Sequence, residues 1–140
     1  MILHCNFEEI QALKAGGSSI LEGGAEGSSC VPTPAATRAC VEALLSRLVG
    51  DFDVESLADA RGLRVAVVAI VDHLRAGMEA LVLDSHAADE SAVAAYFDFA
   101  HALSVSHRLD EMVAEMEAVV ELLTGEPADD EVALAFRFPD

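Results

Sequence analysis

The apolar positions near the start of the chain recur at the three- and four-residue spacing that places them on one face of a helix. Asn6 and Glu9 have the spacing of a capping box, in which each side chain bonds the backbone N–H of the other residue. We therefore predict an amphipathic helix over residues 7–22. Gly16 and Gly17 weaken this prediction, because glycine is a poor helix former.

Two further helices are predicted in the middle of the chain. Thr33 is expected to cap a helix whose first turn contains Pro34, and Gly50 is expected to end it. A longer helix is predicted over residues 57–84, because its apolar side chains share one face: Leu63, Val67, Ile70, Leu74, Met78 and Leu81. The run 65–71 is also rich in β-branched residues, so a buried strand is an alternative there.

The stretch 89–124 is helical by propensity, but its apolar face changes direction along the helix. Tyr96, Phe97, Phe99, Ala100 and Leu103 centre on one direction, and Leu109, Met112, Val113, Met116, Val120 and Leu123 centre on the opposite one. The pattern leaves open whether the helix breaks near residues 104–108 or continues and packs against two neighbours. A continuous helix would leave one face outside its own bundle, and that face would need a partner subunit.

The two ends of the chain have the character of short strands. Residues 1–5 are apolar and extended, whereas residues 132–138 alternate between apolar and small or polar positions. The alternation places Val132, Leu134, Phe136 and Phe138 on one side. We predict that the two segments pair with each other, within or between subunits.

Together these elements predict a mostly α fold: a bundle of four to five helices with a small β element formed by the N- and C-terminal strands. A chain of 140 residues with 53 % hydrophobic residues is long enough to bury one core. We therefore predict a single acidic helical domain over residues 1–140. Residues 23–33 are rich in glycine and serine, so a flexible loop is predicted there.

The charge of the chain restricts its partners. It has 25 acidic and 8 basic residues, which gives a formal net charge of −17. Nucleic acids and anionic membrane surfaces bind clustered Lys and Arg, so we expect neither as a partner. No stretch reaches the roughly 18 apolar residues of a membrane span. The first residues also lack the pattern of a signal peptide, so a cytoplasmic location is expected.

No motif in the sequence identifies a catalytic centre or a cofactor site. Cys5, Cys30 and Cys40 lack the spacing of metal ligands and are expected to be free thiols. Asp98 and His101 have the i, i+3 spacing of one part of a di-iron site, but a complete site needs a second such pair. We therefore expect no metal and no cofactor.

These patterns favour a small acidic, non-enzymatic interaction or assembly protein over an enzyme. Its expected surfaces are a helix face with Leu109, Met112, Val113, Met116 and Val120, and a sheet edge with Val132, Leu134, Phe136 and Phe138. We expect a homo-oligomer, and a basic protein is a second candidate partner. One alternative is a ferritin-like metal or oxidoreductase module that uses Asp98 and His101. Another is an acidic inhibitor that imitates nucleic acid or fills a basic cleft.

Overall fold

The computed structural model describes residues 1–23, 33–84 and 89–138. The predicted flexible loop at 23–33 falls almost entirely outside these residues. Their elements follow in the order β1 (Ile2–Leu3), α1 (Phe7–Gly23), α2 (Ala35–Leu45), β2 (Phe52–Asp53), α3 (Leu57–Leu83), α4 (Asp89–Thr124) and α5 (Asp130–Ala135). The predicted mostly α bundle with a small β element is confirmed.

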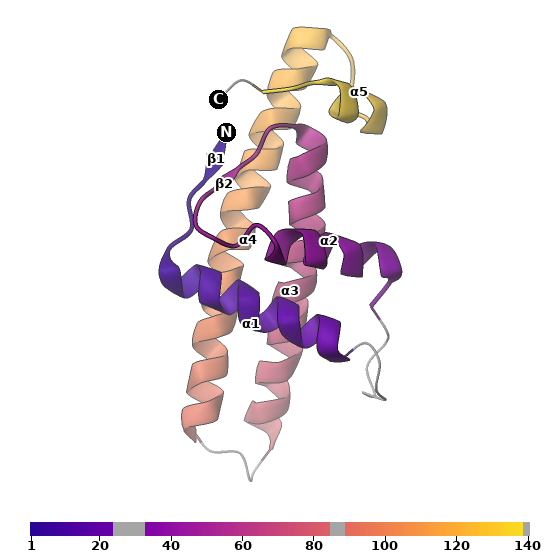
Figure 1. The fold of residues 1–140 in the computed structure, drawn as a ribbon. Helices are drawn as coiled ribbons and strands as arrows, with labels where there is room; N and C mark the ends of the chain where they lie inside the picture. The colour runs from indigo at the N-terminus through magenta and orange to yellow at the C-terminus, as the bar shows by residue number, and fades with distance from the viewer. Residues whose placement is uncertain (24–32, 85–88, 139–140) are drawn as a thin grey trace.

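The scaffold is a hairpin of two long helices, α3 with 27 residues and α4 with 36. The helices α1 and α2 pack across this hairpin, and α5 lies against α3 at the end where that helix begins (Figure 1). The opposite end of the hairpin, where α3 stops and α4 starts, extends below α1 in the same view. Within the described residues, no helix has an apolar stretch long enough to cross a bilayer.

The helix starts follow the local signals of the sequence, with one exception. The capping box of α1 is formed, because Asn6 N–H donates to Glu9 Oε1 at 2.9 Å and Glu9 N–H donates to Asn6 Oδ1 at 2.8 Å. Ser56 caps α3 by accepting the N–H of Asp59 at 3.1 Å. The exception is α2, which has Pro34 rather than Thr33 at its N-cap.

The two alternatives that the sequence left open are resolved in favour of helix. Residues 65–71 lie inside α3, and α4 runs without a break from Asp89 to Thr124. The helix α2, by contrast, ends at Leu45 rather than at Gly50. The chain after it tightens into a turn in which the N–H of Arg47 donates to Leu44 O at 2.9 Å. This turn leads the chain back toward the N-terminus.

The small sheet has a different second strand from the one predicted. The strand β1 pairs antiparallel with β2, with Ile2 opposite Asp53 and Leu3 opposite Phe52. The bonding continues past β2, because Glu55 O accepts the N–H of Phe138 at 2.8 Å. Among the described residues, 52–56 therefore lie between the two chain ends, which do not pair with each other in this chain. The predicted direct pairing within the chain is wrong.

The C-terminal segment is helical where a strand was expected. The side chain of Asp129 accepts the N–H of Val132 at 2.9 Å and thereby caps α5. Asp130 and Glu131 follow in the first turn, where negative charge is favourable. These helix-start signals outweigh the alternation of apolar residues. Only the end of the segment is extended, and there Arg137 forms an isolated bridge with Ser56.

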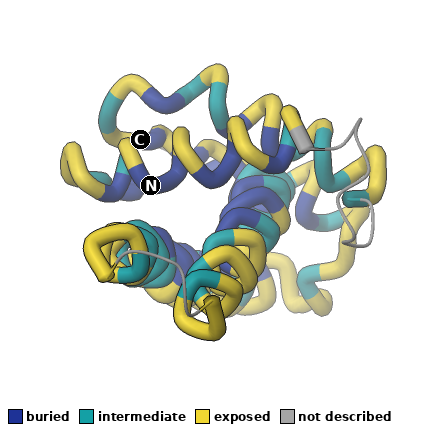
Figure 2. Tube along the Cα trace, turned by 90° about the horizontal axis from the view of Figure 1, so that it is seen from below, coloured by how far each residue is buried: buried dark blue, intermediate teal, exposed yellow. Residues whose placement is uncertain are grey.

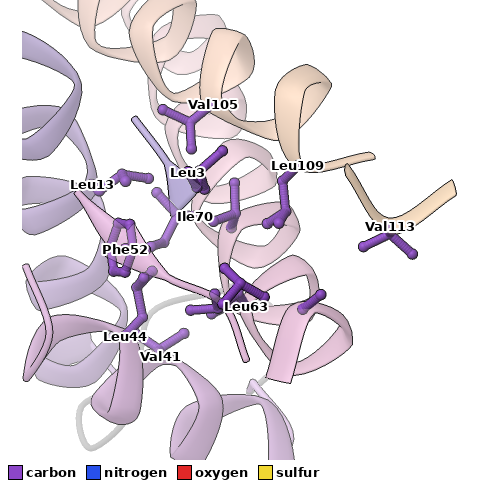
Figure 3. Close-up of a cluster of buried hydrophobic side chains, with 14 of the residues drawn as sticks. Leu3, Leu13, Val41, Leu44, Phe52, Leu63, Ile70, Val105, Leu109 and Val113 are labelled. Carbon is purple, nitrogen blue, oxygen red and sulfur yellow. The ribbon is translucent and has the colours of Figure 1, made fainter. Parts of the chain in front are cut away.

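The core lies between the hairpin and the elements that cross it. Figure 3 shows buried side chains from α1, α2, α3, α4 and both strands converging there: Leu3, Leu13, Val41, Leu44, Phe52, Leu63, Ile70, Val105, Leu109 and Val113. The helix α1 comes very close to its neighbours at two glycines. A Cβ on Gly16 would lie 2.6 Å from Ile70 Cγ2, and one on Gly17 would lie 2.8 Å from Leu45 Cδ2. Packing thus explains the two residues that weakened the helix prediction.

Candidate functional site

The second apolar face of α4 points into the chain's own core. Leu109, Val113, Met116 and Val120 are fully buried, and Met112 is partly buried against the same cluster. A side chain that its own chain covers is not available to a second subunit. This placement corrects the assignment of these residues to an interface. Because α4 is continuous, one of its two apolar faces lies outside the core, and this is the face of the first half of the helix.

The four apolar residues of the predicted C-terminal strand do not share a face. Phe138 is buried, Val132 and Phe136 are partly buried, and Leu134 is 65 % exposed. The rings of Phe136 and Phe138 meet edge to face with centroids 4.9 Å apart. Because α5 is a helix, only every third or fourth of its side chains points inward. The segment therefore closes the core, and these four side chains do not line the edge of a sheet.

Asp98 and His101 both lie on α4 and are partly buried. Asp98 lines a pocket with Ser19 of α1 and His73 of α3, whereas His101 does not line that pocket. In the described residues, no group of three or more His, Cys, Asp or Glu side chains is close enough to hold a metal ion. The two residues are therefore not brought together with further ligands in this part of the chain.

Large apolar side chains are exposed where α3 stops and α4 starts. We call this region the arm and define it as residues 76–84 and 89–98. Among the described residues, five large apolar side chains of the arm are more than half exposed: Val82, Leu83, Val93, Tyr96 and Phe97. Figure 2, viewed from this end of the hairpin, shows its near turns exposed or partly buried and its buried turns further away. Contiguous apolar patches mark interaction surfaces, and these five side chains all belong to the last turns of α3 and the first turns of α4.

The arm is acidic as well as apolar. Residues 76–107 contain no Lys or Arg, and the arm carries five carboxylates: Glu79, Asp84, Asp89, Glu90 and Asp98. This absence of Lys and Arg extends over the whole arm and about two and a half further turns of α4. The arm therefore combines apolar side chains with charge of a single sign, a pattern that attracts cationic groups.

Four of the seven arginines hold the body of the fold together. Arg38 donates to the carbonyls of Ile20 at 3.2 Å and Leu21 at 2.9 Å, which lie near the end of α1. Further bonds join Arg47 to Asp59, Arg61 to Glu117 and Arg108 to Glu9. Each of these ion pairs neutralises a carboxylate outside the arm. None of these bonds therefore pairs an arginine with a carboxylate of the arm.

A pocket of about 260 Å³ lies at the root of the arm, where α1 crosses α3 and α4. Its polar groups are Ser19, His73 and Asp98, and its other walls are apolar. A hydrogen bond joins Ser19 Oγ and His73 Nε2 at 2.7 Å. The pocket therefore places a carboxylate, a hydroxyl and an imidazole beside an apolar surface.

The N-terminal segment is fixed by a second polar cluster. Arg108 donates to the carbonyl of His4 as well as to Glu9, and His4 Nδ1 donates to Asp51 Oδ2 at 2.9 Å. This bond from His4, together with the N–H of Cys5, holds the pKa of Asp51 below its usual value. Burial and the charge of Glu9 raise the pKa of the Cys5 thiol to about 11. Cys5 is therefore protonated near neutral pH and is a poor nucleophile.

Comparisons of the chain with protein-family models, curated proteins and solved structures find no match.

The arm was not predicted from the sequence, although the sequence contained a signal for it. The run 76–107 lacks Lys and Arg while it keeps large apolar residues such as Leu83 and Phe97. Its exposure depends on where α1 crosses the hairpin, which periodicity alone does not tell.

Proposed function

We propose that this protein is a small acidic interaction protein that binds a basic, amphipathic helical segment of another protein against its arm. The observation that carries this proposal is the combination, in the arm, of exposed apolar side chains and carboxylates with no Lys or Arg in the sequence of the arm. The apolar groups would be covered by the apolar face of the bound helix. The carboxylates around them would pair with its Lys and Arg side chains.

Charge favours a basic partner over a second copy of this chain. Two arms brought together would face each other with carboxylates and no Lys or Arg. Like charges that lose their water at an interface oppose association, whereas opposite charges speed encounter and fix the register. The stripe at Met112 and Met116 that suggested self-assembly is already part of the core. A homo-oligomer therefore becomes an outcome of the test rather than the proposal.

The apolar part of the arm is large enough to contribute measurably to binding. Leu83 is 85 % exposed and Phe97 is 55 % exposed. Full burial of one such side chain contributes about 1.5–3 kcal/mol, so covering the exposed parts of both would contribute about 2–4 kcal/mol. Loss of either side chain should then weaken binding about tenfold.

The test is a binding titration with a fluorescent Leu/Lys peptide designed to be an amphipathic helix. A second peptide has the same composition in an order that destroys the apolar face. We expect the first peptide to bind more tightly, and we expect Leu83→Ser and Phe97→Ser to weaken that binding. Leu122→Ser is the matched control, because Leu122 is 82 % exposed but lies near the other end of α4. This variant should bind as the wild type does.

Three results would contradict the proposal. If the two peptides bind equally and added salt abolishes their binding, the protein acts only as a polyanion, of the kind that fills a basic cleft. Equal weakening by Leu122→Ser would show that the arm is not special. A wild-type mass of two chains that Leu83→Ser reduces to one would show that a second copy covers the arm. Sedimentation of the wild type and of Leu83→Ser provides that last measurement.

A further inference from the structure

The pocket at the root of the arm has the size and the chemistry of a site for one side chain. Its volume of about 260 Å³ is below the roughly 300–1,000 Å³ of a small-molecule site. Gly77 and Ala95 keep it open, because both are small residues in its wall. A Cβ built on Gly77 would have no neighbouring atom within 4 Å. Position 77 therefore faces open space, and a larger side chain has room there at the wall of the pocket.

The polar groups of the pocket suit a cation. Asp98 contributes a carboxylate, and in the described parts of the chain no Lys or Arg forms an ion pair with it. Ser19 contributes a hydroxyl to the same pocket, held in place by the hydrogen bond with His73. Met78 forms part of the apolar wall. An apolar wall that ends in a carboxylate matches an alkyl chain that ends in an ammonium group.

We propose that this pocket binds the side chain of a lysine from the partner. The four-carbon stem would lie along Met78 and Ala95, and the ammonium group would donate to Asp98 and Ser19. This inference rests on the proposed function, because the lysine belongs to the basic helix that covers the arm. It adds a specific anchor at the root of the arm to the general attraction of the acidic surface.

The test uses n-pentylammonium as the probe, with n-pentanol as its neutral counterpart of the same length. Backbone amide shifts of the wild-type protein are followed by NMR during each titration. We expect the ammonium ion to bind in the millimolar range with shifts at Ser19 and Asp98, and to bind more tightly than the alcohol. Asp98→Asn should weaken the ammonium ion about fivefold, as for a partly exposed ion pair. The exposed Asp110→Asn on the same helix is the control and should leave binding unchanged.

Gly77→Leu provides a second, steric test, because the larger side chain fills the pocket and removes no charge. It should abolish the shifts at Ser19 while circular dichroism shows an unchanged helix content. Absence of shifts at the pocket in the wild type would overturn the inference. Equal binding of the two probes, or equal effects of Asp98→Asn and Asp110→Asn, would overturn it as well.

Peptide binding separates this inference from the proposed function. If Gly77→Leu binds the amphipathic Leu/Lys peptide as the wild type does, the arm binds a basic helix but the pocket holds no lysine. If the ammonium ion binds but the peptide does not, the pocket is a cation site and the proposed function is wrong.

Discussion

Replacing Gly16 with alanine should destabilise this protein, although alanine is the better helix former. In a helix interior the change from glycine to alanine is favourable by about 1 kcal/mol. At Gly16, however, the new methyl group would lie 2.6 Å from Ile70 Cγ2 and 3.2 Å from Leu74 Cγ. Carbon atoms attract at about 3.5–4.0 Å, and overpacking a core costs about 1–3 kcal/mol. Ile70 is fully buried, so it has little room to move away.

We therefore expect Gly16→Ala to lower the free energy of unfolding by up to about 2 kcal/mol, which is the overpacking cost less the gain in helix propensity. Gly62→Ala is the matched control, because Gly62 lies inside α3 and a Cβ there would meet no atom within 4 Å. That change should raise the free energy of unfolding by about 1 kcal/mol. The free energies of unfolding of the two variants should thus differ by about 1–3 kcal/mol, the cost of overpacking, with Gly16→Ala the less stable.

The assay is equilibrium unfolding in urea, followed by circular dichroism. The midpoint should move while the slope stays constant, since neither change alters the surface exposed on unfolding. A double-mutant cycle with Ile70→Ala isolates the cause, because that change removes Cγ2. The penalty at Gly16 should then disappear, with a coupling energy of about 1–3 kcal/mol. If Gly16→Ala stabilises as much as Gly62→Ala, α1 does not lie against Ile70 and the packing argument fails.

Two further predictions test the core and the N-terminal cluster. Met116→Glu should unfold the protein, as seen by circular dichroism, because Met116 is fully buried and an ionised carboxylate is costly to bury; a folded variant with reduced mass would instead restore the interface interpretation. Asp51 has a lowered pKa in the folded state, so its stabilising contribution is complete above its ordinary pKa of 3.8 and is lost as the pH falls through the lower folded value. Melting temperatures of the wild type and Asp51→Asn should differ at neutral pH and converge in acid, and parallel profiles would contradict the bonds from His4 and Cys5.

The local features of this fold could be predicted from the sequence. The capping box of Asn6 and Glu9 and the cap of α3 at Ser56 join groups three residues apart, so the pattern contains all the information they need. The periodic apolar residues of α3 likewise identified the side of the helix that is buried at Leu63, Val67 and Ile70. Such signals predict the structure correctly because a helix fixes the relative directions of nearby side chains, whatever lies around it.

The tertiary structure alone decided the features that depend on contacts between distant segments. The strand β1 pairs with Phe52–Asp53 because the turn after α2 returns the chain there, and no pattern in either segment specifies the other. Periodicity located the apolar face around Leu109 but did not tell whether α3 or another subunit covers it. The arm is exposed for the same kind of reason. A side chain such as Phe97 is buried only if a neighbour reaches it, and the crossing point of α1 leaves it in solvent.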